Sequence, residues 1–483
     1  MATSRPGETN DAPKNRAVRF PYPIFQRLFS PRDHLRPQRW NWSLFNEQLD
    51  RAVRRTSAEP LETEHVGGLR HFLLDGFFSS FSENLAITFV PIFALAFGAS
   101  NSQIGLLTAL ANLLGTLSLF PGAALSERTR SRKRVVLITA GGASRILFLL
   151  LTALPFFVLP AQAAIWIVII VNAGRTFLNN YANSPWTDMV ADLVPDHMRG
   201  RYFTTRGQLM GIAALLAAPI GGWMIQTLVG GPHHGFAGYQ LVFFAAFAFG
   251  AVSTYAFSRI PEVNAVGRPR IRHRRGDLRR SVRENPQFVA FLAGALVWNI
   301  SIQVAGPFFN VYLVSDLKAG VEVVGYSAGV TSLTTLLGQY LFGRLIVSRG
   351  SYWVQKVTGI LIPILPALWI VIREPYQVYF ISVFSGILWG GYNLSNFNLM
   401  LEYSPASQRP RAVALYQTVV FSSAVIGPLI GGILIDIFSF NFCFGVSAGG
   451  RVIGTALFLA LLRRGRSRKR RTNADGGRPL PNS

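Results

Sequence analysis

From residue 70 onward, twelve apolar runs alternate with polar loops, most of them short. A transmembrane α-helix needs ~20 predominantly apolar residues, and each run is about that long or longer. The pattern therefore predicts an all-α membrane protein with twelve transmembrane helices. The runs comprise residues 70–97, 103–121, 135–158, 161–187, 204–228, 237–258, 288–314, 324–346, 351–373, 376–400, 412–436 and 441–463.

The run at residues 161–187 carries a polar stripe although it should cross a membrane. Steps of three and four residues place the whole stripe on one helix face, within an arc of roughly 80°. An arginine near the bilayer centre costs ~2.5 kcal/mol or more on insertion scales, so it should face a bundle interior, a water-filled cavity or a partner. A substrate cavity is one interpretation, and a stripe that only packs helices together is the other. The stripe consists of Asn172, Arg175, Asn179, Asn183 and Trp186.

Composition supports a membrane protein and excludes a disulfide-built secreted fold. Half of the residues (50%) are hydrophobic and only 14% are charged, as expected for a chain of spanning segments. The single cysteine, Cys443, permits no intrachain disulfide. The formal net charge of +24 would suggest nucleic acid in a soluble protein. Here the basic residues gather in the termini and in alternate loops, so we expect no nucleic-acid partner.

The basic loops predict the orientation of the chain. Arginines and lysines follow the second run at Arg128, Arg130, Arg132, Lys133 and Arg134, the fourth at Arg199 and Arg201, and the sixth at nine positions between residues 259 and 283. The alternate loops offer only Lys318 and Arg373 as clear cases. By the positive-inside rule, both termini and the basic loops are cytoplasmic. We expect a multi-pass protein of the cell inner (plasma) membrane, with its basic side on the anionic cytoplasmic leaflet.

The two halves of the chain echo each other. Pro195 and Arg199 recur as Pro405 and Arg409, Gly221-Gly222 recurs as Gly431-Gly432, and Asn183 falls on Asn393, each at an offset of 210. Such coincidences predict a duplicated six-helix unit, which in transporters places the binding site at the interface between repeats. The expected domains are an N-terminal cytoplasmic tail (1–69), an N-terminal six-helix bundle (70–258), a basic cytoplasmic linker (259–287), a C-terminal six-helix bundle (288–463) and a basic cytoplasmic tail (464–483).

The N-terminal tail lacks the apolar core and cleavage site of a signal peptide. Apolar residues recur in it at helical spacing beside arginines, at Trp42, Phe45, Leu49 and Val53. This pattern suits an amphipathic helix on an anionic membrane surface, and an unstructured basic tail is the alternative.

The loop after the second run resembles a signature of the major facilitator superfamily, Gly-x-Leu-x-Asp-Arg-x-Gly-Arg-Lys. Here it reads Leu125, Ser126, Glu127, Arg128 and then Ser131, Arg132, Lys133, with glutamate for aspartate, serine for the second glycine and one extra residue. The resemblance covers residues 70–463 and implies two pseudo-symmetric six-helix bundles. An acid at a helix end beside arginines can form a charge-assisted latch. We therefore expect Glu127, Arg128, Arg132 and Lys133 to act in a cytoplasmic gate; a charge run that only sets topology is the alternative.

The resemblance implies that helices one, four, seven and ten line a central cavity, and each of these carries a polar stripe. Amides donate and accept hydrogen bonds, tryptophans offer flat apolar area, and the arginine fork suits a carboxylate or phosphate. We expect the stripes to form a substrate and proton pathway. Beside the stripe of helix four, they comprise Asp75, Ser79, Ser82 and Glu83 in helix one, Asn299, Gln303, Gly306 and Asn310 in helix seven, and Trp389, Asn393 and Asn396 in helix ten.

Glu83 and Arg175 are expected to form the functional centre. Helices one and four enter the membrane from opposite sides, so at ~1.5 Å per residue both groups lie roughly 18 to 20 Å deep. A buried carboxylate whose ionisation depends on a nearby arginine suits proton coupling, and a static salt bridge is the alternative. Arg145 of helix three is expected to be a structural partner for an acid on a neighbouring helix.

These observations predict a secondary carrier, proton-coupled or facilitative, for a small organic solute. In the resembling family a Gly-Pro-x-x-Gly-Gly run in helix five accompanies exporters; here the run is complete in helix eleven, from Gly427 to Gly432, and one residue short in helix five. This favours efflux slightly. A membrane receptor or scaffold that keeps the fold without transporting is the alternative.

We expect neither an enzyme nor a cofactor. The Gly-x-Ser-x-Gly sequences around Ser327 and Ser447 have no preceding strand and no histidine in the same half, as a nucleophile elbow would require. His233 and His234 alone make too small a metal site. The partners expected are a small solute, protons if transport is coupled, and the lipid bilayer, with the protein acting as a monomer.

Overall fold

The computed structural model describes residues 63–475 apart from 130, 196, 230–234, 263–285 and 404–408, together with scattered positions between 47 and 56. Residues 49–483 form one compact unit. The pair His233 and His234, most of the basic linker, and Trp42 and Phe45 of the tail lie outside the described residues, as do the side chains of Glu127 and Arg128.

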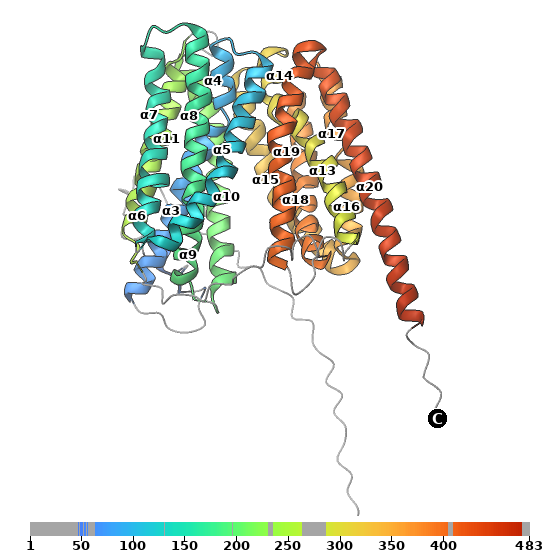
Figure 1. Cartoon of the computed structure of the whole chain (residues 1–483). Helices are drawn as coiled ribbons and strands as arrows, with labels where there is room; N and C mark the ends of the chain where they lie inside the picture. Colours follow the sequence, from blue (N-terminus) through green and yellow to red (C-terminus); the bar gives the residue numbers. More distant parts are fainter. Residues whose placement is uncertain are drawn as a thin grey trace, which may run out of the picture. The chain divides into compact units, whose positions relative to one another are not determined.

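The first half of the chain forms six spans, some of them built from two or more short helices that run side by side with their neighbours (Figure 1). The elements are α3 (Thr63–Ile87), α4 (Val90–Ala96), α5 (Asn101–Arg128), α6 (Arg132–Val136), the π-helix η1 (Leu137–Ala143), α7 (Ser144–Ala153), η2 (Leu154–Phe156), α8 (Ala161–Tyr181), α9 (Asn183–Leu193), α10 (Arg199–Val229) and α11 (Ala237–Ser258).

The second half repeats this arrangement. Its elements are α13 (Pro286–Ala305), η3 (Gly306–Phe308), α14 (Phe309–Ser315), α15 (Val321–Arg349), α16 (Ser351–Leu361), α17 (Ile364–Val371), α18 (Gln377–Tyr403), α19 (Arg409–Ile437) and α20 (Phe440–Asp475). Within the described residues, eleven helices are long and apolar enough to cross a membrane. The twelfth predicted span, residues 376–400, corresponds to helix α18, which is outside these eleven. The prediction of an all-α protein with twelve spans is confirmed.

The outer faces of these helices are suited to lipid. Large apolar side chains such as Trp166, Ile170 and Phe244 are exposed on the helix surfaces, whereas Phe93 and Phe243 are fully buried between helices. Exposed apolar area on this scale would promote association in water, but in a bilayer it contacts acyl chains. The hydrophobic pattern of the sequence therefore corresponds to two kinds of burial, one against protein and one against lipid.

The span predicted over residues 161–187 is present and extends from Ala161 to Leu193. It is interrupted at Ala182, so that Asn183 and Trp186 belong to α9 rather than to α8. Pro185 has no N–H to donate to the Tyr181 carbonyl, which interrupts the hydrogen-bond ladder at this point. The freed carbonyl of Tyr181 lies against Gly122 of α5, where a side chain would leave no room.

Two predictions about the ends of the chain change as well. Helix α20 runs on to Asp475, so the first part of the expected basic tail continues the last span as a helix. Leu49 and Val53 of the expected amphipathic segment are buried in the protein, which leaves them no lipid contact. The surface-helix prediction for the rest of that segment stays a prediction.

The repeated glycine pairs lie where one half of the protein contacts the other. A Cβ atom on Gly432 of α19 would come within 2.6 Å of the Asn101 carbonyl oxygen at the start of α5, and one on Gly222 of α10 within 3.0 Å of the Val321 carbonyl oxygen at the start of α15. The second glycine of each pair therefore lets its helix approach the first turn of a helix from the other half. The repeat seen in the sequence has an equivalent packing role in both halves.

A polar contact joins the halves at the same end. Asp436, one turn beyond Gly432, accepts hydrogen bonds from the Ser102 backbone N–H at 2.9 Å, from the Ser102 hydroxyl at 2.5 Å and from the Asn101 side-chain amide at 3.0 Å. A carboxylate at a helix N-terminus is stabilised by the free N–H groups there. We call this end the far end, and the opposite end, which carries Thr129, Ser131 and the start of α10, the basic end.

Candidate functional site

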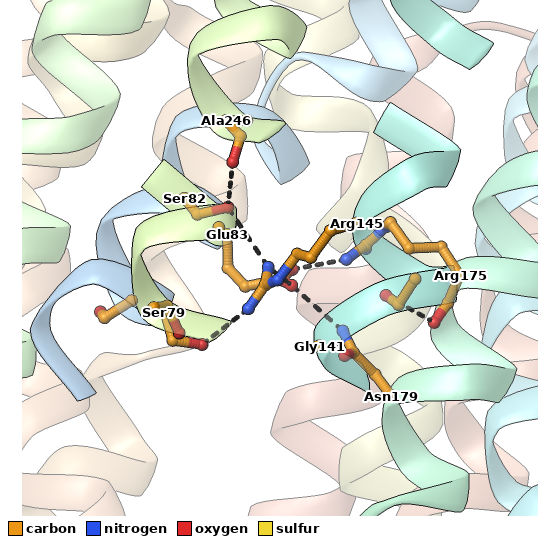
Figure 2. Close-up of polar contacts among 12 residues, drawn as sticks. Ser79, Ser82, Glu83, Gly141, Arg145, Arg175, Asn179 and Ala246 are labelled. Atoms are coloured by element: carbon orange, nitrogen blue, oxygen red, sulfur yellow. Dashed lines mark hydrogen bonds and ion pairs between the residues drawn. The ribbon is translucent and has the colours of Figure 1, made fainter. Parts of the chain in front are cut away.

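Glu83 is the hub of a polar cluster inside the N-terminal bundle (Figure 2). Its carboxylate, on α3, accepts hydrogen bonds from Arg145 of α7 at 2.7 Å, from Arg175 of α8 at 2.5 Å and from the Asn179 side-chain amide of α8 at 3.1 Å. Arg145 and Arg175 are 5% and 2% exposed, so both guanidinium groups are buried in the bundle. Two arginines thus share one carboxylate, a charge-assisted arrangement that holds three helices together.

Arg145 forms several hydrogen bonds in the interior of the bundle. Besides Glu83, it donates to the hydroxyls of Ser79 at 2.8 Å and Ser82 at 3.2 Å. Its side chain lies across Gly250 of α11, where a Cβ atom would come within 2.6 Å of Cδ. The expected role of Arg145, a partner for an acid on a neighbouring helix, corresponds to this contact.

A π-helical segment precedes Arg145 and shapes the site. Residues 137–143 form η1 and include Gly141 and Gly142. The Gly141 carbonyl accepts a hydrogen bond from the Thr254 hydroxyl of α11 at 2.8 Å. Such π-helical insertions often occur at functional sites, because the wider turn changes the direction in which later side chains point.

A second ion pair lies about two turns of α3 nearer the basic end. Asp75 of α3 accepts a hydrogen bond from the Ser253 hydroxyl at 2.7 Å and contacts Arg206 of α10 at 3.5 Å. The Arg206 guanidinium stacks near the rings of Phe72 and Trp186, with its central carbon 4.2 and 5.4 Å from their centroids. Asp75 and Arg206 are 7% and 8% exposed. This pair is held by aromatic packing as much as by hydrogen bonds.

A pocket of about 260 Å³ adjoins both ion pairs. Its walls come from α3, α6, η1, α7, α8, α9, α10 and α11, so it lies within the N-terminal bundle. The polar part of the wall consists of Asp75, Ser79, Arg145, Asn179, Asn183, Arg206, Ser253 and Thr254. The apolar part includes Trp186, Met210 and Phe257. The polar groups of helices one and four therefore face a space inside one half of the protein.

The corresponding region of the C-terminal bundle is nearly filled. A pocket of only about 20 Å³ lies there between α13, α16, α18 and α20, with Trp298, Tyr392 and Phe458 in its wall. The pseudo-symmetry is visible in one contact: the Thr455 hydroxyl donates to the Gly359 carbonyl at 2.8 Å, as Thr254 does to Gly141. Aromatic side chains thus fill in one half the space that is open in the other.

The predicted residues of the N-terminal half fall into three groups. Glu83, Arg175 and Asn179 contact one another. Asp75, Asn183 and Trp186 line the pocket beside them. Asn172 is buried, and its side-chain carbonyl has no hydrogen-bond partner. The sequence pattern therefore located the polar interior of this bundle, although a break separates the two ends of the stripe.

The predicted residues of the C-terminal half do not gather into a comparable cluster. The Asn299 amide donates to the Ala295 carbonyl of its own helix at 2.7 Å, and the Asn396 amide donates to the Tyr416 hydroxyl at 2.6 Å. Gln303 packs against Gly427 of α19. The remaining three are the half-buried Asn310 and Trp389 and the exposed Asn393. Their role in a substrate pathway stays a prediction.

Sequence reasoning missed two buried arginines. Arg206 was within a predicted span but was not singled out, and Arg451 lies in the middle of the last span, 2% exposed. The signal that identified Arg175, a guanidinium deep in an apolar run, applies equally to Arg451. The partner of Arg206, in contrast, depends on how α3 and α10 pack.

The predicted gate residues with described side chains form contacts within the N-terminal half. Arg132 contacts Asp192 of α9 at 3.1 Å and Asp188 at 3.9 Å. The Lys133 ammonium donates to the Ile260 carbonyl at 2.7 Å. These contacts tie the start of α6 to α9 and to the end of α11. The gate itself stays a prediction.

The Gly-x-Ser-x-Gly sequences have an ordinary structural setting. Ser327 and Ser447 lie inside α15 and α20, and their hydroxyls donate to the backbone carbonyls of Val324 at 2.9 Å and Ser301 at 2.6 Å. Neither residue is on the strand-to-helix turn that exposes a nucleophilic serine.

The sequence matches the Major Facilitator Superfamily over residues 73–376 and 300–482. The chain belongs to this superfamily. It is similar to a protein of Bacillus subtilis (strain 168) described as an uncharacterized MFS-type transporter, YuxJ, with 25% identity over 146 residues, which is 29% of this chain and 37% of that protein. The match thus spans little more than a third of the length of that curated relative.

Solved structures of transporters have the same fold. A mutant form of the nucleoside transporter NupG is similar with a TM-score of 0.64 and 14% identity over 82% of this chain and 99% of that one. A bacterial homologue of the lysosomal transporter Spinster gives 0.62 and 14% over 83% and 96%. A bacterial homologue of the iron transporter ferroportin gives 0.60 and 13% over 82% and 98%. The chain is therefore an integral, multi-pass membrane protein with the fold of a major facilitator transporter.

Proposed function

We propose that this member of the superfamily is a secondary carrier that moves a small organic solute across the membrane by alternating access. The observation that supports this most directly is the polar cluster around Glu83, which lies in the membrane interior beside a pocket of about 260 Å³. Burying charged groups at this depth costs free energy, so charged clusters there usually mark a functional site. Binding a solute that enters from water is such a function.

Contacts between the halves support a state that is closed at the far end. Ser102 of α5 meets Asp436 of α19, and one to three turns further along α5 Gly105 packs on the Pro428 carbonyl and the Asn112 amide donates to the Ala424 carbonyl at 3.2 Å. On the other side of the molecule, Gly329 of α15 packs against α10. These contacts must break for the far end to open. Their small glycine surfaces and few polar bonds make such rocking feasible.

Glu83 is the proposed coupling acid. Its side chain is 24% exposed, whereas those of its partners Arg145 and Arg175 are 7% and 3% exposed. Its partners Arg145 and Asn179 line the pocket. A partly exposed carboxylate beside such a pocket can exchange a proton with entering water and can release its arginines when it does so. We propose proton coupling through Glu83, with the basic end in the cytoplasm and efflux as the favoured direction.

Cysteine labelling tests alternating access directly. Asn183 and Asn393 are both exposed, in α9 and α18, so Asn183→Cys and Asn393→Cys should react with an impermeant maleimide from alternate sides of oriented vesicles as the transport cycle is driven. The native Cys443 is fully buried, so the unmodified protein serves as the unlabelled control. Labelling from a single side under every condition would instead support a receptor or scaffold that keeps the fold without transporting.

A further inference from the structure

The buried charges of the protein are unbalanced. Among the described residues, the charged side chains less than 9% exposed are one acid, Asp75, and four arginines, Arg145, Arg175, Arg206 and Arg451. Glu83, which is partly buried, supplies a second carboxylate. Two acids for four arginines leave two positive charges in excess, one of them in the N-terminal bundle. An uncompensated charge in a low-dielectric interior is unfavourable, so this excess calls for an anion.

The arginines differ in how fully their donors are used. Arg145 and Arg175 make hydrogen bonds of 2.7 and 2.5 Å to Glu83. The contacts of Arg206 with oxygen atoms are longer, at 3.4 Å to the Phe72 carbonyl and 3.5 Å to Asp75. Good N–H···O bonds lie at roughly 2.7–3.2 Å. Among the three buried arginines of the N-terminal bundle, Arg206 thus has the longest contacts with oxygen, and its remaining nitrogen donates to the Met210 sulfur at 3.1 Å. It also lines the pocket.

Flat contacts fix the orientation of Arg206 in addition to its hydrogen bonds. The guanidinium lies between the rings of Phe72 and Trp186. It also rests on Gly76, where a Cβ atom would come within 2.8 Å of Nε and 2.9 Å of Cζ. A guanidinium that is held by flat contacts and has only long bonds to oxygen can exchange those bonds for a planar, two-point partner. Carboxylates and phosphates have this geometry.

We propose that the pocket binds a small organic anion whose carboxylate or phosphate group pairs with Arg206. The amides of Asn179 and Asn183 and the hydroxyl of Ser79 complete the polar wall, and Trp186, Met210 and Phe257 contact the organic part. The volume of about 260 Å³ is below the ~300 Å³ at which pockets for drug-sized ligands begin, so the ligand is smaller than a typical drug. This inference rests on the proposed carrier function and adds its substrate class.

Asp75 acts as an internal competitor for the anion. It already holds Arg206 at 3.5 Å and keeps a stronger hydrogen bond of 2.7 Å with Ser253. An incoming anion can therefore displace Asp75 from Arg206 while Ser253 still satisfies the carboxylate. The charge excess of the cluster is then neutralised by the ligand. Removal of Asp75 should strengthen anion binding, and removal of Arg206 should weaken it.

A matched series of probes tests the inference. Purified full-length protein is titrated with benzoate, phenyl phosphate, benzamide and benzylammonium, which share one ring and differ in the head group, and binding is followed by calorimetry. We expect at least one of the two anions to bind and neither the neutral amide nor the cation to do so. Asp75→Asn should tighten anion binding, and Arg206→Gln should weaken it about tenfold or more. The stronger anion identifies the head group as carboxylate or phosphate.

Two control variants keep the result interpretable. Arg206→Gln alone leaves Asp75 without its cation, so the double variant Asp75→Asn with Arg206→Gln, which removes both charges, should remain folded and still lose anion binding. Arg344 also lies over an aromatic ring, that of Tyr340 at 4.4 Å, but outside the pocket, so Arg344→Gln should bind like the wild type.

Several outcomes would overturn the anion site. These are equal binding of benzamide or benzylammonium, failure of both anions at millimolar concentration, or unchanged binding in the folded double variant. Two-sided labelling of Asn183→Cys and Asn393→Cys in the same preparations would then show that the carrier function still stands. One-sided labelling would contradict the proposed carrier function, whichever probes bind.

Discussion

Gly76 of α3 lies directly beneath the guanidinium of Arg206 on α10. A Cβ atom at position 76 would come within 2.8 Å of the Arg206 Nε atom and 3.0 Å of one terminal nitrogen, closer than such atoms pack. The Arg206 side chain of α10 thus packs directly on the backbone of α3. The absence of a side chain at Gly76 decides where the positive charge of the pocket lies.

We therefore expect Gly76→Ala to displace Arg206 and to reduce anion binding and transport. Alanine gains about 1 kcal/mol over glycine from helix propensity alone, so any fall in melting temperature must come from the displaced arginine. Gly67→Ala is the matched control, because this glycine is on the same helix and nothing lies within 4 Å of its added Cβ atom. Wild-type anion affinity in Gly76→Ala would mean that the position of Arg206 is unimportant for binding.

Glu83→Gln tests the proposed coupling acid. A neutral side chain that cannot release a proton should abolish proton-driven accumulation of solute in proteoliposomes but leave downhill exchange. A purely structural bridge would behave differently, because two buried arginines would lose their carboxylate, a change that costs roughly 3–5 kcal/mol when a buried pair is broken. The measurement is uptake with and without a pH gradient, at matched amounts of folded protein.

The double variant Glu83→Gln with Arg145→Gln separates these two roles. It restores the net charge of the wild-type cluster and leaves one unpaired arginine, Arg175, instead of two, so a stability defect caused by unpaired arginines should be partly rescued. Lost coupling should not be rescued. Accumulation with wild-type pH dependence in either variant would exclude Glu83 as the coupling site.

Asp436→Asn should weaken the closed far end. Both oxygens of the carboxylate accept hydrogen bonds from Ser102 and Asn101, whereas an amide keeps only one acceptor oxygen and carries no charge. Loss of charge-assisted bonds at this partly exposed site corresponds to about 1 kcal/mol, which is a several-fold shift in a two-state equilibrium. Impermeant maleimide should then label Asn393→Cys faster from the far side.

A control for this variant is available at the same end. Asp316 accepts a hydrogen bond from the neighbouring Ser315 hydroxyl at 2.9 Å, a contact within one half of the protein. Asp316→Asn should leave the labelling rate unchanged. Equal rates in both variants and the wild type would show that the Asp436 contact does not hold the halves together.

The loop after α5 is expected to act as a gate at the basic end. Glu127→Gln together with Arg128→Ala should lower the transport rate at unchanged membrane abundance, because a charge-assisted latch would be weakened while the pocket stays intact. Arg132 is already paired with Asp192 at 3.1 Å, so α6 should stay anchored in the variant. Wild-type turnover would leave these residues with a role in topology only.

Much of the fold follows from the sequence, because the lipid bilayer places the same requirement on each spanning segment separately. A spanning segment must satisfy its own backbone and present apolar side chains, so its position can be read from some twenty consecutive residues. The same reasoning located Arg175 and Glu83 at similar depths, and the two are in contact at 2.5 Å. The depth of a residue in the membrane can be estimated by counting residues from the end of its helix, because each residue adds about 1.5 Å.

Partners across helices are a different kind of information, because they depend on the rotation and tilt of each helix. The sequence could not show that Arg145 would share Glu83, that Arg206 would lie on Gly76, or that the break at Ala182 would turn Trp186 toward the pocket. Nor could it show that the open space lies inside the N-terminal bundle while aromatic rings fill its counterpart. Apolar and polar periodicity set which residues enter the membrane and which face is polar; the packing of helices from distant parts of the chain decided which charges meet and where a solute can fit.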